Sequence, residues 1–383
     1  MELELVEPLL SAVPEAWRAW LLLGLAFAGA LALLLTTLKS LGEGLGWVWR
    51  SLLAAARWIA RLFRRPPPPP EPGPEPAPIP EEKTIWEREP ISPIYPLWGE
   101  RENLPIITVA NMKGGVGKTT LVANLAARFQ RDSDRPVLVI DFDYQGSLSE
   151  TFAKQAERSQ EAMRAHTLLF GELGDADALT HARPLALGLE KVEYYPARYE
   201  FATIENNLMI DWVEQPEAGD IRYRLCKYLR SQQFQKHYSM VLIDCPPRLT
   251  TGTINALCAS THLLIPTKLD EMSAEAAIYF LQQIQRMKNS LFPRLSVIGV
   301  VPTMTNEAER LSDYEERARD RIMLFGEHQL GRADLLLMES RIPNKLDIGR
   351  FAGAGVAYLR RPAIRPIFDR LAEDMKRRID AHR

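Results

Sequence analysis

We expect an α/β domain with a mostly parallel sheet and helices on both of its faces, over about residues 101–383. Short, continuously apolar runs alternate there with helical patterns, which is typical of parallel strands covered on both sides. A glycine-rich loop joins the first apolar run to the first helical pattern. We expect a transmembrane helix and an amphipathic helix ahead of this domain.

Composition excludes several classes of protein. The chain has 383 residues, of which 46% are hydrophobic and 25% charged, so chain-wide disorder is excluded. The formal net charge of −2 provides no global basic field for nucleic acid. Three scattered cysteines are too few for a disulfide framework or a four-ligand zinc site, and they favour a reducing compartment.

Residues 19–38 form the longest apolar run and contain no charged residue. As a helix rising about 1.5 Å per residue, they would span roughly 30 Å, the thickness of a bilayer's hydrocarbon core. A buried core helix is one alternative, but such a helix is rarely apolar on every side. A cleaved signal peptide is another, but it would begin with basic residues, whereas this chain begins with glutamates. We expect a retained transmembrane helix.

The charges that flank this run predict its orientation. Residues 1–18 carry four Glu and one Arg, whereas the residues between the run and the proline tract carry six basic residues and one Glu. Basic flanks stay on the cytoplasmic side of a membrane. The prediction is a single-pass membrane protein with a short extracytoplasmic N-terminus and everything after Lys39 in the cytoplasm.

Residues 44–65 indicate a basic amphipathic helix at the membrane surface. Five arginines fall within an arc of about 100° on a helical wheel, opposite Trp49, Leu52 and Ile59. Arginines on one face would meet anionic lipid headgroups. A second span is disfavoured because each interior arginine would cost about 2.5–3.5 kcal/mol. The alternative is a solvated helix packed on the globular domain.

Residues 66–82 form a proline-rich linker. Ten prolines lie between Pro66 and Pro80, and proline lacks the amide donor that helices and sheets need. At about 3.1 Å per residue, a polyproline spacer would reach on the order of 50 Å. A stiff tether is the interpretation, and a ligand for an SH3-type domain is the alternative.

The domain itself begins at about residue 101. Five apolar runs predict strands at 105–110, 136–141, 240–244, 262–266 and 296–301. Four patterns predict helices at 118–129, 221–235, 273–287 and 314–325.

The strongest chemical signal is the loop after the first predicted strand. It reads Lys113, Gly114, Gly115, Val116, Gly117, Lys118, Thr119 and Thr120. Glycines let backbone amides turn toward an anion, and the following helix adds its positive end. Lys118 supplies a charge for the β- and γ-phosphates, and the hydroxyl of Thr119 can bind Mg²⁺. Met112 stands where the plain P-loop pattern has its first glycine.

Carboxylates follow two of the other predicted strands. Asp141 and Asp143 end the second run, and Asp244 ends the run before Cys245, Pro246 and Pro247. Ligands of open parallel sheets bind at the carboxyl ends of the strands. Carboxylates there can hold Mg²⁺ and its waters, or orient the water that attacks the γ-phosphate. Each Asp alone could be a turn former or helix cap.

These motifs resemble those of the ParA/MinD family of deviant Walker A ATPases. The similarity covers about two-thirds of the chain. The segments that carry it are KGGVGKTT at 113–120, D-x-D-x-Q-G at 141–146 and D-x-P-P at 244–247, with weaker matches at 263–277, 298–306 and 339–359.

The resemblance implies that ATP and Mg²⁺ bind between two copies of the chain. Lys113 would reach across to the phosphates of the partner copy, and Lys118 would bind phosphate within its own copy. Asp143 would orient the hydrolytic water. Together these three residues would form the catalytic set of an ATP hydrolase.

The resemblance also implies the remaining binding residues. Thr119, Asp141 and Asp244 would form the metal set, and Asp244 would serve the switch that reads the γ-phosphate. Pro302 and Thr303 would lie near the adenine. The chain departs from the family pattern within the 141–146 segment, where Tyr144 stands in place of the more common proline.

The predicted function is an ATP-dependent dimer switch that positions or assembles a membrane-associated partner or cargo. The predicted partners are a second copy of the chain, the lipid bilayer and an unidentified protein. The family resemblance implies that this membrane is a bacterial inner membrane. The tail 360–383 holds eight basic and four acidic residues, so nonspecific DNA binding is possible although not favoured.

Three alternatives remain open. A bacterial tyrosine kinase of the polysaccharide co-polymerase type also joins membrane helices to a P-loop domain, but it usually carries a tyrosine-rich tail, and 360–383 contains no tyrosine. A non-enzymatic anchor would bind nucleotide without turnover. A DNA-partitioning ATPase would use the basic tail.

Overall fold

The computed structural model describes residues 84–89, 104–154, 164–170, 174–216, 219–306, 310–351 and 355–381. The chain divides into two compact units, 1–75 and 76–383, and every described residue belongs to the second. The expected transmembrane helix at 19–38, the amphipathic helix at 44–65 and the linker at 66–82 lie outside the described residues.

The prediction of an inner-membrane location requires a correction. Across the described segments, no helix is both long and apolar enough to cross a bilayer. The single-pass location is therefore withdrawn.

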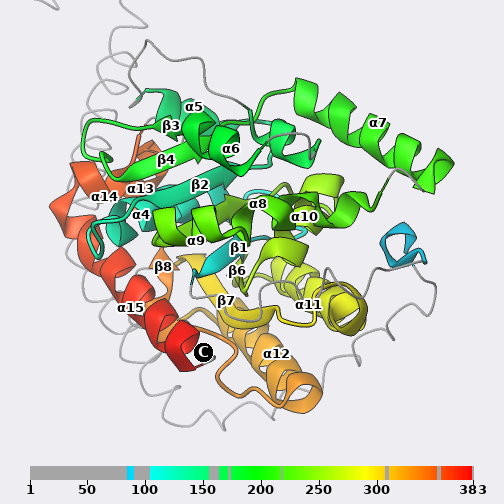
Figure 1. Cartoon of the computed structure of the whole chain (residues 1–383). Coiled ribbons are helices and arrows are strands. Elements are labelled where there is room, and N and C mark those ends of the chain that lie inside the picture. The colour runs from blue at the N-terminus through cyan, green and yellow to red at the C-terminus, as the bar shows by residue number, and fades with distance from the viewer. Residues whose placement is uncertain are drawn as a thin grey trace, which may run out of the picture. The chain divides into compact units, whose positions relative to one another are not determined.

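One mostly parallel sheet forms the centre of the domain (Figure 1). Its described strands are β1 (Ile106–Val109), β2 (Val137–Asp141), β3 (Arg183–Pro184), β4 (Val192–Tyr195), β5 (Met240–Asp244), β6 (His262–Lys268), β7 (Ser296–Thr305) and β8 (Ile342–Pro343). Their order across the sheet is β3-β4-β2-β5-β1-β6-β7-β8, and only the β3–β4 pair is antiparallel. The predicted α/β class with a mostly parallel sheet is confirmed for the domain, and all five predicted strands are present.

Helices cover both faces of this sheet (Figure 1). Those described are α4 (Lys118–Phe129), α5 (Ser147–Ala153), α6 (Asp175–His181), α7 (Glu200–Glu214), α8 (Arg224–Leu229), α9 (Gln232–His237), α10 (Thr251–Ala259), α11 (Glu271–Leu291), α12 (Asp313–Leu330), α13 (Leu346–Phe351), α14 (Ala357–Arg360) and α15 (Arg365–Ala381). Short 3₁₀ turns lie between them, including η1 (Ile85–Glu87), η2 (Ala165–Leu169), η4 (Ile221–Tyr223), η5 (Met338–Ser340) and η6 (Pro362–Ile364).

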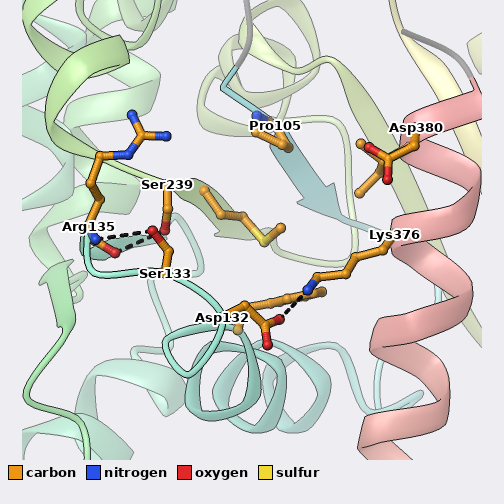
Figure 2. Close-up of a pocket in the computed structure, with 10 residues that line it drawn as sticks. Pro105, Asp132, Ser133, Arg135, Ser239, Lys376 and Asp380 are labelled. Atoms are coloured by element: carbon orange, nitrogen blue, oxygen red, sulfur yellow. Dashed lines mark hydrogen bonds and ion pairs between the residues drawn. The ribbon is translucent and has the colours of Figure 1, made fainter.

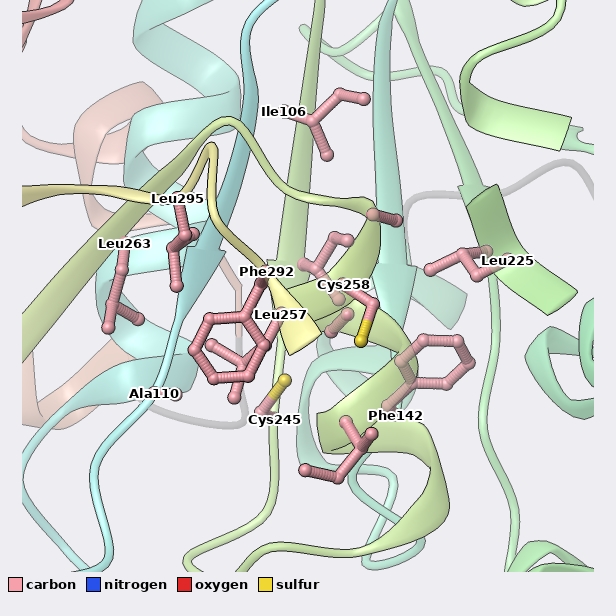
Figure 3. Close-up of a cluster of buried hydrophobic side chains, with 14 of the residues drawn as sticks. Ile106, Ala110, Phe142, Leu225, Cys245, Leu257, Cys258, Leu263, Phe292 and Leu295 are labelled. Atoms are coloured by element: carbon pink, nitrogen blue, oxygen red, sulfur yellow. The ribbon is translucent and has the colours of Figure 1, made fainter. Parts of the chain in front are cut away.

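The strands are apolar on both sides because each side packs on a different helical layer. Alternate residues of one strand point to opposite faces, so Ile106 of β1 joins one core and Ile107 joins the other. The first core lies beneath α8, α10, α11 and α12, and the second beneath α4 and α15. Figure 3 shows part of the first core, where Cys245 and Cys258 lie among leucines and phenylalanines.

The predicted helix at 221–235 is wrong as one element. The structure has η4, α8 and α9 there instead. The helical path stops at Arg230, and Ser231 then begins a new helix because its side chain accepts a hydrogen bond from the backbone N–H of Phe234. Ser231, a helix-capping residue type in the middle of an apolar pattern, was the sequence signal for this break.

Candidate functional site

The glycine-rich loop lies between β1 and α4, at the carboxyl edge of the sheet. Gly115 and Gly117 have φ values of 69° and 84°, in the left-handed region that side chains disfavour. Gly117 is also the N-cap of α4, so the loop turns directly into the helix at Lys118. At Gly114 and Gly115 an added Cβ would meet nothing within 4 Å, so this backbone borders open space. The loop amides and the positive N-terminal end of α4 therefore lie at the same position, which suits the binding of an anion.

Two buried polar side chains fasten the loop to neighbouring strands. The Asn111 amide donates to the carbonyl of Pro266 at 2.7 Å and accepts from the backbone N–H of Lys113 at 3.0 Å. The Thr303 hydroxyl lies 2.9 Å from the carbonyl of Val116 and 3.0 Å from that of Thr267. The sequence analysis missed Asn111, for which the only signal was a polar residue at the end of an apolar strand.

Thr303 was predicted to lie near the adenine, and its hydroxyl donates to the backbone carbonyl of Val116 in the loop. Pro302, which pairs with Thr267, belongs to the same strand β7. Met304 follows in a left-handed conformation, with φ 53° and 44% exposure. A base contact by Pro302 or Thr303 stays a prediction.

Lys118 is buried at the base of the loop. Its side chain is 7% exposed, and its Nζ donates to the carbonyl of Lys113 at 3.2 Å. Burial lowers the pKa of the Lys118 ammonium, and the nearby carboxylates of Asp244 and Asp143 act against that lowering. A partly desolvated cation beside a loop of backbone amides suits a phosphate group. Lys113 is half-buried, and its predicted reach to a second copy stays a prediction.

Asp244 and Thr119 form the second half of the site. The Thr119 hydroxyl donates to Oδ2 of Asp244 at 2.7 Å. Oδ1 of Asp244 is buried and has no hydrogen-bond partner among the described residues. Burial raises the pKa of the Asp244 carboxyl well above its usual range, and the neighbouring Asp141 raises it further. A buried carboxylate oxygen without a donor is well suited to a cation or its water ligands.

Asp141 lies directly beside Asp244 in the sheet, where the two residues pair in register. Its oxygens accept hydrogen bonds from the backbone N–H of Asp143 at 3.0 Å and from the N–H and hydroxyl of Ser149 at 2.9 and 2.7 Å. Burial raises its pKa to about 7. These contacts organise the turn before α5, so the geometry favours a structural role, and its predicted role as a magnesium ligand stays a prediction.

Asp143 occupies the mouth of the site. It is half-buried, its Oδ1 accepts from the backbone N–H of Gln145 at 3.0 Å, and its charge acts on Lys118. Tyr144 follows it, with the Arg248 guanidinium 4.8 Å from its ring centroid and the Tyr199 ring at 6.3 Å. The tyrosine that replaces proline therefore connects the segment after β2 to the segment after β5.

These residues fit a nucleotide with Mg²⁺. The described part of the chain contains no group of three or more His, Cys, Asp or Glu that could hold a metal by itself. Magnesium in nucleotide sites is usually held by one or two protein ligands together with phosphates and waters, and Thr119 with Asp244 supplies that number. A cation there would offset the charge of the phosphates.

A separate cavity lies away from this site. It measures about 310 Å³ and lies at the amino-terminal ends of β1, β2 and β5, opposite the glycine loop (Figure 2). Lys376 of α15 pairs with Asp132 at its rim at 2.6 Å. The glycine loop and the carboxylates beside it lie at the carboxyl ends of the strands. This side of the sheet is open, as is expected where a second molecule completes a site.

The fold and this edge define a P-loop nucleotide-binding protein with a parallel α/β sheet. The AAA domain family matches residues 104–297. The chain belongs to that family, and its relatives place it among the ParA/MinD-type P-loop ATPases.

Two relatives illustrate the likeness in sequence. The chromosome partitioning protein ParA of Caulobacter vibrioides is 32% identical over 58% of this chain and 78% of its own length. The chromosome-partitioning ATPase Soj of Thermus thermophilus is 30% identical over 52% of this chain and 68% of its own.

Solved structures show the same fold. Apo McdA of Cyanothece superposes with a TM-score of 0.57 at 20% identity, covering 72% of this chain and 100% of McdA. The septum site-determining protein MinD of Pyrococcus horikoshii, complexed with Mg-ADP, has a TM-score of 0.51 at 20% identity, covering 73% and 99%. Such complexes support ATP and Mg²⁺ as the cofactors of this family.

Proposed function

We propose that this protein is an ATP-driven switch that binds ATP with Mg²⁺, pairs with a second copy and resets by hydrolysis. The switch would position or assemble a protein partner or cargo. The observation that carries the proposal is the convergence of the glycine loop, Lys118, Thr119 and Asp244 at one edge of the sheet. The ParA and Soj relatives, named for chromosome partitioning, support a positioning role.

In this proposal each residue acts on the phosphates in a distinct way. Lys118 and the loop amides bind the β- and γ-phosphates. Thr119 and Asp244 hold Mg²⁺, which neutralises part of the phosphate charge. Asp143 orients the attacking water at the open mouth of the site, and Lys113 reaches the phosphates of the second copy.

The open edge supports dimerisation as part of the switch. Met304, at 44% exposure, lies near the end of β7, and Leu346, at 77%, follows β8, both on the carboxyl side of the sheet. Apolar side chains exposed beside a charged ligand site are typical of a surface that becomes covered. A second copy seated over the nucleotide would cover them and bring its own Lys113.

The test replaces Asp143 with alanine. We expect Asp143→Ala to bind ATP–Mg²⁺ about as tightly as the wild type but to release phosphate at least about tenfold more slowly, because general-base and water-positioning groups contribute about 10²–10⁴-fold. The variant should also accumulate as a dimer with ATP in sedimentation analysis. Asp211→Ala, which changes an exposed aspartate of α7, is the matched control.

Two outcomes contradict the proposal. Normal phosphate release by Asp143→Ala would remove that residue from the reaction. A wild-type protein that stays monomeric at saturating ATP–Mg²⁺ would remove the switch.

A further inference from the structure

Residues 84–89, which precede the domain in the sequence, pack against it. Thr84 begins the 3₁₀ turn η1, and its backbone N–H donates to the Glu87 carboxylate at 3.0 Å, so that the turn is capped by its own residues. This segment, drawn in blue in Figure 1, joins the main body of the domain through contacts with α7 and α11. The family match begins at residue 104, so this segment lies outside the matched range.

Trp86 is the centre of the contact. It is 5% exposed, and its ring lies 6.3 Å from that of Trp212 on α7 with an interplanar angle of 13°. Glu87 forms an ion pair with Arg286 of α11 at 2.8 Å, with both side chains largely shielded from solvent. A tryptophan that buries about 150–250 Å² is the kind of side chain that anchors an interface.

Arg222 binds the peptide backbone of this segment. The residue is fully buried, and its guanidinium donates to the carbonyls of Trp86 at 2.7 Å and Arg88 at 2.9 Å. Its other N–H groups bind the Asp220 carboxylate at 2.8 and 2.6 Å. A buried charge costs free energy unless it is paired and hydrogen-bonded. The two carbonyls of the segment contribute to that pairing.

The helix that carries Trp212 also contacts the nucleotide side of the molecule. Glu205, seven residues earlier on α7, accepts a hydrogen bond from the backbone N–H of Gly252 at the start of α10, at 2.6 Å. Phe201 of α7 lies 5.5 Å from Phe142, which follows β2. Seven helical residues span about 10 Å. One helix therefore contacts the 84–88 segment, Phe142 next to Asp143, and the start of α10 in the segment that follows Asp244.

We propose that residues 84–88 are a docking peptide of the same chain, seated on α7 and α11, and that α7 couples this docking to the nucleotide site. The peptide determines where the N-terminal extension leaves the domain. Nucleotide binding changes the docking because Phe142, directly after β2, and the start of α10, which follows β5 along the chain, contact the same helix. This inference adds a site to the proposed switch.

Hydrogen–deuterium exchange of the full chain tests the docking without nucleotide. In the wild type, the amides of 84–89 should exchange at least about tenfold more slowly than in the Trp86→Ala variant, since local opening controls exchange. Ile85→Ala is the matched control, because Ile85 belongs to the same turn but is 43% exposed. Arg88→Ala, which removes contacts of 3.4 and 3.1 Å to the carbonyls of Trp212 and Val213, is a second variant.

Protection that is absent in the wild type, or equal in Trp86→Ala and Ile85→Ala, overturns the docking. Protection that rises with protein concentration means that the peptide docks on another copy, and it also overturns the proposal.

The coupling has a separate readout. Saturating ATP–Mg²⁺ should change the exchange rate of 84–89 in the wild type and leave it unchanged in Trp86→Ala. Equal exchange with and without nucleotide, in a protein shown by calorimetry to bind ATP, overturns the coupling. Failure to bind ATP at all would contradict the proposed function instead, because the docking experiment is done without nucleotide.

Discussion

Two neighbouring aspartates show how the same residue type takes different roles at one edge of a sheet. Asp141 and Asp244 are paired in register and are both buried. Asp141 accepts three hydrogen bonds from the turn that follows it, whereas Oδ1 of Asp244 has no donor among the described residues. The difference arises because Ser149, in the first turn of α5, donates two hydrogen bonds to Asp141, whereas Thr119 of α4 donates to Asp244 at Oδ2 alone. A free buried oxygen, rather than an acidic residue as such, indicates the ligand site.

At the residue scale, Lys118 should decide nucleotide affinity. Replacing it with alanine removes a buried ammonium whose hydrogen bonds to a charged phosphate are worth about 1.5–3 kcal/mol each. We expect the ATP dissociation constant to rise by roughly 10–100-fold in isothermal titration calorimetry. Lys236→Ala, at an exposed position of α9, is the control. Equal affinity of the Lys118 variant and the wild type would contradict the assignment.

At the scale of elements, α12 depends on its first turn. Ser312 and Glu315 form a capping box, and Glu315 accepts from the Ser312 N–H at 2.9 Å and the Asn306 N–H at 3.0 Å. Burial acts to raise the pKa of Glu315, but its hydrogen bonds to Ser312 and Asn306 outweigh burial and lower the pKa below its usual value. The ionised carboxylate therefore stabilises the folded state.

Glu315→Ala should lower the free energy of unfolding by about 1–2 kcal/mol at neutral pH, measured by urea denaturation. A group whose pKa is lower in the folded state stabilises the fold above its unfolded pKa, and that contribution is lost as the pH falls through the folded pKa. The difference between wild type and variant should accordingly shrink in acid. Glu316→Ala, at an exposed neighbouring position, should show neither effect. A pH-independent difference would contradict this account.

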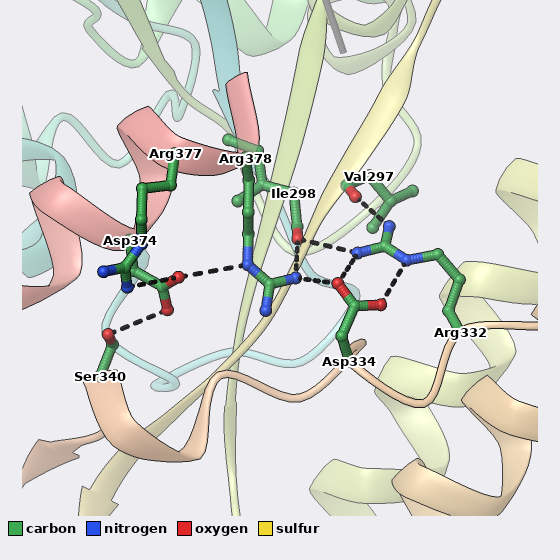
Figure 4. A network of polar contacts seen from close by, with 8 residues as sticks. All are labelled: Val297, Ile298, Arg332, Asp334, Ser340, Asp374, Arg377 and Arg378. Atoms are coloured by element: carbon green, nitrogen blue, oxygen red, sulfur yellow. Dashed lines mark hydrogen bonds and ion pairs between the residues drawn. The ribbon is translucent and has the colours of Figure 1, made fainter. Parts of the chain in front are cut away.

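Arg378, near the end of the last helix α15, joins this helix to neighbouring parts of the domain. Arg378 donates to Asp334 at 2.8 Å and to the carbonyl of Ile298 at 3.0 Å, and it also approaches Asp374 at 3.4 Å (Figure 4). Several basic residues that the sequence analysis considered for DNA therefore have partners within the domain. Lys376, which pairs with Asp132, is another.

Arg378→Ala should lower the free energy of unfolding by about 1–3 kcal/mol, because it removes the hydrogen bonds that a guanidinium only 18% exposed makes to Asp334 and to the carbonyl of Ile298. Arg377→Ala should change it by less than about 0.5 kcal/mol, since Arg377 is 75% exposed and its ion pair lies at the surface. Chemical denaturation of both variants makes the comparison. Similar losses for the two arginines would mean that the contacts of Arg378 add nothing.

At the scale of the whole molecule, one face of the sheet is closed by helices that lie far apart in the sequence. α4 and α15 are separated by more than half of the domain, and both pack on the same core. Because Phe368 of α15 is fully buried in that core, Phe368→Ala should lower the free energy of unfolding by about 3–5 kcal/mol. Glu373→Ala, at an exposed position of α15, is the control in thermal denaturation. If Phe368→Ala lowers the free energy of unfolding no more than Glu373→Ala does, the burial of Phe368 in this core is contradicted.

Much of the site was predictable because its signals are local. The loop from Lys113 to Thr120 carries its glycines, lysine and threonine within eight residues, and the strand before it is continuously apolar. The elements that were missed lack such local signals. β4 and α7 follow a segment of mixed character, and the helix at 221–235 was divided by Ser231, whose capping bond appears only when the chain folds.

The amino-acid order alone determined the parallel α/β class, the phosphate loop and the identity of the carboxylates near it, because strand periodicity and loop chemistry are properties of adjacent residues. Tertiary structure decided which carboxylate has a free oxygen, that Asn111 and Thr303 fasten the loop, and that Trp86 is seated beside Trp212. The fastening of the loop and the packing of Trp86 on Trp212 depend on residues between 36 and 187 positions apart. No local pattern encodes such contacts, since only packing brings the partners together.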